Sequence, residues 1–73
     1  MNPTTIQYVR FRNGEWQYLF ESNFKQGVTL VPVVGTVVAI PSMTNDFVVT
    51  RVRFDILHGN VEIEVSELYG TAA

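Results

Sequence analysis

The chain of 73 residues contains no cysteine, only one histidine and few charged residues, which make up 16% of the total. Without cysteine, no disulfide supports the small core and no thiolate can hold a metal. His58 stands alone and lies beside Gly59 in an expected turn, whereas a metal site draws on several ligands. We therefore interpret His58 as a solvated turn residue, and we expect no cofactor and no metal.

Motifs that carry catalysis are also missing. The sequence holds no nucleophile elbow of the G-x-S-x-G type, no phosphate-binding loop and no dinucleotide fingerprint. Asp55, Glu62 and Glu64 could gather weakly around a divalent cation, but a solvated strand face is the favoured interpretation. A chain this small also has difficulty enclosing a pocket that excludes water. The sequence therefore predicts no catalytic residues and no enzymatic activity.

Long hydrophobic runs are absent as well. The longest apolar stretch covers residues 28–40 and is interrupted by threonine, proline and glycine, so it is too short to span a bilayer. Residues 1–5 are polar and do not resemble a secretory signal. From these features we expect a cytoplasmic protein that makes no contact with a membrane.

No segment places apolar residues at helical spacing, and β patterns take their place. Residues 6–21 form two alternating runs around Asn13-Gly14, a pair whose tolerance of positive φ makes it the strongest short hairpin signal. A two-residue turn there pairs Phe11 with Trp16 and Tyr8 with Leu19. One face, predicted to be the core face, then carries Val9, Phe11, Trp16, Tyr18 and Phe20. The opposite face carries Ile6, Tyr8, Arg10, Arg12, Glu15, Gln17, Leu19 and Glu21.

Residues 47–68 predict a second hairpin, with its turn within residues 57–60. The expected register places Phe54 opposite Ile63 and Arg53 opposite Glu64. The same register sets Asp55 opposite Glu62, an unfavourable pair of like charges. Between the hairpins, residues 28–31 and 36–40 are candidate short strands, and Pro32 favours an edge or a bend.

Together these patterns predict an all-β domain over residues 1–70 with a frayed tail at 71–73. The expected architecture is a small antiparallel barrel or compact sheet of five to six strands, built from hairpins 6–21 and 47–68. Its size matches an SH3-like or OB-like barrel.

The function predicted from these features is that of a non-enzymatic protein-interaction module, or of a small accessory subunit of a larger assembly, including one from a mobile element. The partner would be another protein or a second copy in a homo-oligomer. The expected partner-binding patch is Tyr8, Arg10, Gln17 and Leu19, because Tyr and Arg dominate binding hot spots. An ordinary strand face under the segment 22–34 is the competing interpretation. The open edge near residues 28–34 is a second candidate docking surface.

Binding of single-stranded nucleic acid is the alternative function. Tyr8, Arg10 and Arg12 could stack on bases and contact phosphates. The net charge of −2 supplies no global basic footprint, however, and the carboxylates gather in the second half of the chain. The predicted register also assigns Trp16 to the core, so nucleic acid is the minor hypothesis.

Overall fold

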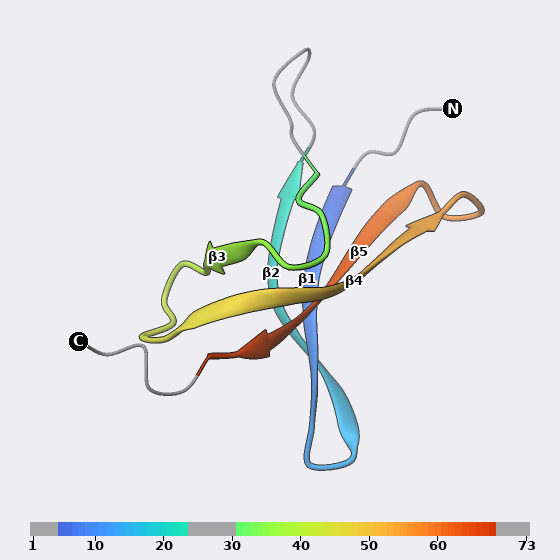
Figure 1. The fold of residues 1–73 in the computed structure, drawn as a ribbon. Helices are drawn as coiled ribbons and strands as arrows, with labels where there is room; N and C mark the ends of the chain where they lie inside the picture. The colour runs from blue at the N-terminus through green and yellow to red at the C-terminus, as the bar shows by residue number, and fades with distance from the viewer. Residues whose placement is uncertain (1–4, 24–30, 69–73) are drawn as a thin grey trace.

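Five strands form a single curved sheet in the computed structural model, which describes residues 5–23 and 31–68. Along the sheet the strands lie in the order β2-β1-β5-β4-β3, and the sheet curls into a half-barrel (Figure 1). The strands are β1 (Thr5–Arg12), β2 (Glu15–Asn23), β3 (Val37–Ala39), β4 (Asp46–Asp55) and β5 (Asn60–Glu67). The all-β prediction is confirmed. Among the described residues, no helix is long and apolar enough to cross a membrane.

The pairing of β1 with β5 at the centre of the sheet is parallel, whereas the other three strand pairs are antiparallel. The sheet is therefore mixed rather than wholly antiparallel as expected. This pairing joins the two hairpins, because each contributes one strand to it: β1 comes from the first hairpin and β5 from the second. A register between segments so distant in the chain leaves no local mark in the sequence.

The core lies on the inner face of the curved sheet, and most of it comes from the second hairpin. Its buried side chains are Ile6, Ile40, Phe47, Val49, Val61, Ile63 and Val65. β5 has neighbours on both sides, so every second residue along it, from Val61 to Val65, is shielded from water. Tyr8, Leu19 and Phe20 pack against this cluster from the first hairpin.

A β-bulge interrupts the first hairpin at Leu19. The Asn13-Gly14 turn forms as predicted, with φ of 54° and 79°. The expected pairs are confirmed from the turn as far as Val9 and Tyr18. Tyr8 then pairs with Phe20 rather than with Leu19, so the predicted pairing of Tyr8 with Leu19 is wrong. Leu19 is the extra residue, and it moves Phe20 to the side of Tyr8, where the two ring centroids lie 6.3 Å apart.

Apart from Phe20, which packs against the core as predicted, the two faces of this hairpin are the reverse of the prediction. Phe11, Trp16 and Tyr18 were expected in the core, but 58%, 55% and 54% of their surfaces are exposed. Ile6, expected on the outer face, is buried. The cause is the parallel pairing, which aligns Ile6 with Val61 and so turns this side of β1 toward the core. Assigning Trp16 to the core was therefore wrong.

The second hairpin exists, but its register differs from the predicted one by two residues. Its turn covers residues 56–59, Phe54 pairs with Val61, and Arg53 pairs with Glu62. The predicted like-charge pair does not form, because Asp55 lies opposite Asn60. A bulge at Thr50 then brings Val49 opposite Val65.

The connection between the hairpins is described only in part. β3 confirms the short strand expected within residues 36–40 and lies at one edge of the sheet. Most of the strand expected at 28–31 lies outside the described residues, as does the tail at 71–73. Of the candidate edge at 28–34, residues 31–34 are described and form no strand. Ser22 and Asn23 lie within β2.

Candidate functional site

Four apolar side chains of the first hairpin lie together on the outer face of the sheet, and we call them the aromatic platform. They are Val9, Phe11, Trp16 and Tyr18. Phe11 and Trp16 are directly opposite in the register, and their rings meet edge to face with centroids 5.2 Å apart. Such a contact stabilises the pair by about 0.5–1.5 kcal/mol beyond area burial, which helps to hold both exposed rings in place.

One edge of the platform is fixed by a hydrogen bond from the Tyr18 hydroxyl to the carboxylate of Glu21. Desolvation raises the pKa of Tyr18, and the neighbouring Glu21 raises it further. The phenol therefore stays protonated at neutral pH and remains a donor. The platform thus combines exposed ring area with a polar group at its border.

A charged band on β5 and β4 lies beside the platform. Glu64 is the register partner of Val9, and Arg51 is in turn the partner of Glu64. Arg53 Nη1 lies 2.8 Å from Glu62 Oε1, and this hydrogen bond with its ion pair raises the pKa of Arg53. Arg51 makes no ion pair within the described part of the chain.

A groove of about 310 Å³ separates the platform from the charged band. Its lining residues are Val9, Trp16, Arg51, Arg53, Glu62 and Glu64. The groove has one apolar wall and one charged wall, and its two arginines balance its two glutamates. This arrangement suits an apolar group that enters beside Trp16 and is surrounded by polar contacts.

The predicted binding patch lies on the other face, at the border of the core. Tyr8 and Leu19 pack against the core cluster, and burial raises the pKa of Tyr8. Arg10 Nε donates to Gln17 Oε1 at 2.8 Å, and Arg10 Nη1 lies 3.0 Å from Glu67 Oε1. Only 13% of the Arg10 side chain is exposed. The structure does bring the four residues to one face, but there they make contacts within the domain, and their binding to a partner stays a prediction.

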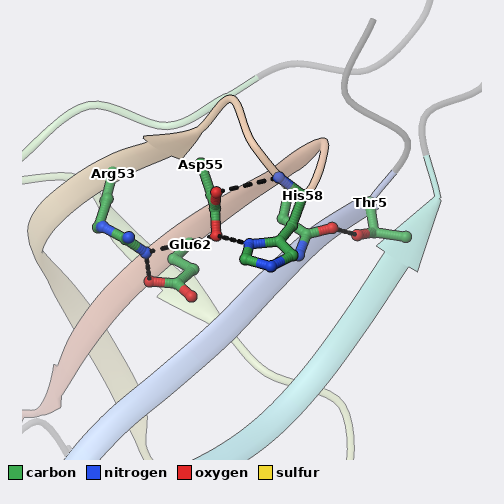
Figure 2. Close-up of polar contacts among 6 residues, drawn as sticks. Thr5, Arg53, Asp55, His58 and Glu62 are labelled. Atoms are coloured by element: carbon green, nitrogen blue, oxygen red, sulfur yellow. Dashed lines mark hydrogen bonds and ion pairs between the residues drawn. The ribbon is translucent and has the colours of Figure 1, made fainter. Parts of the chain in front are cut away.

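The β4–β5 turn places two aliphatic side chains in water, Ile56 and Leu57, which we call the turn tip. Each is 87% exposed, more than any other large apolar residue described. Asp55 holds the turn: its Oδ1 accepts the backbone N–H of His58 at 3.1 Å, and its Oδ2 lies 2.9 Å from His58 Nδ1 (Figure 2). The hydrogen bonds from His58, together with the nearby Arg53, lower the pKa of Asp55.

The base of the same turn is tied to the first hairpin. Thr5 Oγ1 donates to Asn60 Oδ1 at 2.7 Å, which joins the beginnings of β1 and β5 (Figure 2). Gly59 N–H donates to the carbonyl of Asp55 at 2.9 Å. The turn tip is therefore presented by a turn with defined hydrogen bonds. His58 is exposed in this turn, as predicted.

No group of three or more metal-ligating side chains occurs within residues 5–23 and 31–68. Sequence reasoning missed both the platform and the turn tip. The platform was hidden because the parallel β1–β5 pairing, which decides the faces, has no local signal. The turn tip had a local signal, since Ile-Leu in a turn departs from the usual Gly, Asn, Asp and Pro.

No known protein family, curated protein or solved structure matches this chain.

Proposed function

We propose that this chain is a non-enzymatic protein-interaction module that docks a partner on the aromatic platform. The observation that carries the proposal is the exposure of three rings, Phe11, Trp16 and Tyr18, on one face. Exposed aromatic side chains give large contact area at low entropic cost, and Trp and Tyr dominate binding hot spots. The adjoining charged band provides the polar rim that surrounds the apolar centre of a typical interface.

The edges of the sheet favour a face rather than an edge as the docking surface. β2 is an edge strand, but it is bulged at Leu19 and carries Glu15 and Glu21 near its ends. β3 forms the other edge and has only three residues. Bulges, charges and short length all discourage the addition of a partner strand.

The same proposal extends to the biological role of the chain as part of a larger assembly. A small cytoplasmic subunit or accessory protein of a larger assembly, including one from a mobile element, needs a docking face and no catalytic group. The patch of Tyr8, Arg10, Gln17 and Leu19 is the second candidate docking surface, at the border of the core.

Replacement of Trp16 tests the proposal. In a pull-down from the native host, the Trp16→Ser variant is expected to lose the partners that the wild-type chain retains. Val33→Ser removes an exposed apolar side chain outside the platform and is expected to retain them. Partner retention by Trp16→Ser, combined with its loss in an Arg10→Glu, Leu19→Ser double variant, would move the docking surface to the inner-face patch.

Single-stranded nucleic acid is the second candidate ligand, because the exposure of Trp16 removes the reason for placing it in the core. Three exposed rings offer a stacking surface for bases. Glu62 and Glu64 border that surface and repel phosphates. Titration with an oligothymidylate at low salt, monitored by the fluorescence of Trp16, tests whether the chain binds single-stranded nucleic acid. Quenching that weakens steeply with added salt supports this candidate, and unchanged fluorescence removes it.

A further inference from the structure

The turn tip and the aromatic platform, two of the exposed apolar surfaces in the described part of the chain, lie at opposite ends of the sheet. β1 and β5 run parallel, so the β4–β5 turn lies beside the start of β1, next to Thr5. Phe11 and Trp16 lie at the far end of β1, next to the Asn13-Gly14 turn. Figure 1 shows the separation, with the blue β1–β2 turn at the bottom and the orange β4–β5 turn at the upper right. One molecule therefore cannot bring its turn tip onto its own platform.

The two surfaces have complementary shapes. The turn tip is a projection that carries two aliphatic side chains in a turn held by Asp55. The platform borders a groove beside Trp16. Because the turn is already held by hydrogen bonds, docking requires little further ordering of its backbone.

The docking of one platform on another platform is a poorer solution. The platform lies on the outer, convex face of the half-barrel, since the core fills the inner face. Two convex faces touch over a small area. A projecting turn, in contrast, could enter the groove between the apolar wall of Val9 and Trp16 and the charged wall.

We propose that the turn tip of one copy, Ile56 and Leu57, docks on the aromatic platform of a second copy, head to tail. The inference rests on the proposed function, because it names the partner of the same docking surface. The two surfaces differ, so the contact is heterologous, and each added copy leaves one platform and one turn tip free. Assembly therefore proceeds to a ring or an open filament instead of ending at a symmetric dimer. Two aliphatic side chains make a small interface, which belongs to the weak class and requires high concentration.

Complementation between two single variants tests this geometry. The mass of the wild-type chain is measured at millimolar concentration by light scattering after size exclusion and by sedimentation. We expect assemblies larger than a dimer that dissociate on dilution. Leu57→Ser and Trp16→Ser are each expected to stay monomeric. An equimolar mixture of the two forms a one-to-one heterodimer, because each variant retains the surface that the other lacks. Val33→Ser assembles like the wild type.

The single tryptophan reports which surface is occupied. In the mixture only the Leu57→Ser chain carries Trp16, so a blue shift of emission on adding Trp16→Ser chain shows that this platform is covered. Tyr18→Ser serves as the second platform variant if Trp16→Ser loses the circular dichroism of the folded sheet. With that variant, formation of the heterodimer is followed by mass.

Three results would overturn the proposal: a wild-type chain that stays monomeric, assembly by Leu57→Ser alone, or a mixture without heterodimer. A monomeric wild-type chain that still retains host partners through Trp16 removes this inference and keeps the proposed function. Retention of host partners independent of Trp16, in a chain that shows no complementation, removes both.

Discussion

The two hairpins of this sheet differ in how many of their apolar side chains they bury. Of the seven buried core residues that the structure describes, the β4–β5 hairpin contributes five, whereas the β1–β2 hairpin contributes one, Ile6. Three large rings of β1 and β2 face water instead. The hairpin with the clearer turn signal and the more aromatic sequence is thus the minor contributor to the core.

Neighbouring strands account for the difference. β5 is paired on both sides, while β2 is paired only with β1. The parallel ladder between β1 and β5 ends at Val9 and Glu64, so the strand segments beyond it pair only within their own hairpin. Burial here depends on what a strand lies against, and composition alone does not determine it.

The largest expected effect comes from truncating one side chain in each hairpin. Ile63→Ala removes a fully buried group from the central strand and is expected to lower the free energy of unfolding by about 2–5 kcal/mol. Phe11→Ala removes an exposed ring and its contact with Trp16, so a loss of about 0.5–1.5 kcal/mol is expected. Urea denaturation followed by circular dichroism measures both.

Ile63→Val is the matched control for the core, with an expected loss of about 0.5–1.5 kcal/mol. Similar losses for Phe11→Ala and Ile63→Ala would contradict the comparison. Such a result would mean that the β1–β2 rings are buried in solution, by assembly or by a different register.

The sequence predicts the parts of this fold that depend on local chemistry. Asn13-Gly14 marks its turn because both residues tolerate positive φ, and the pairs next to the turn follow from it. The bulge at Leu19 has no such marker, since Leu is ordinary in a strand. The reason for its position is visible only in the folded sheet, where Tyr8 and Phe20 both pack against the core formed with β5.

The faces of the first hairpin were misassigned for the same reason. A face rich in aromatic residues was taken for the core, and Tyr8 and Arg10 were taken for the exposed side. The parallel pairing of Ile6 with Val61 settles the question, and it joins residues 55 positions apart. In the second hairpin the turn consists of Ile-Leu-His-Gly, and it is held by the side chain of Asp55, the residue just before the turn. A register predicted from the composition of the turn was therefore wrong by two residues.

Replacing one glycine in each turn with alanine compares how strictly the two hairpin turns require positive φ. Gly14 and Gly59 have φ of 79° and 71°, and a Cβ at either position meets no atom within 4 Å. The cost is therefore backbone strain alone, and a loss of about 1–2 kcal/mol is expected for each variant. D-Alanine at either position, introduced by chemical synthesis, favours positive φ and restores or raises stability. Thermal unfolding of the four chains gives the values. A negligible effect at Gly59 would show that the β4–β5 turn is not held as described.

The smallest expected effect is a pH dependence confined to the β4–β5 turn. Hydrogen bonds from His58 lower the pKa of Asp55 below its ordinary value of 3.8. The folded state therefore gains stability from the ionised carboxylate above that value, and the gain is lost as pH falls through the lowered pKa. The difference in Tm between the wild type and Asp55→Asn is expected to shrink as the pH is lowered below 3.8. Asp46→Asn, which alters an exposed carboxylate at the other end of β4, is the control variant. If the Asp55→Asn difference does not change with pH, the carboxylate does not hold the turn, and the turn tip is less firmly presented than the platform.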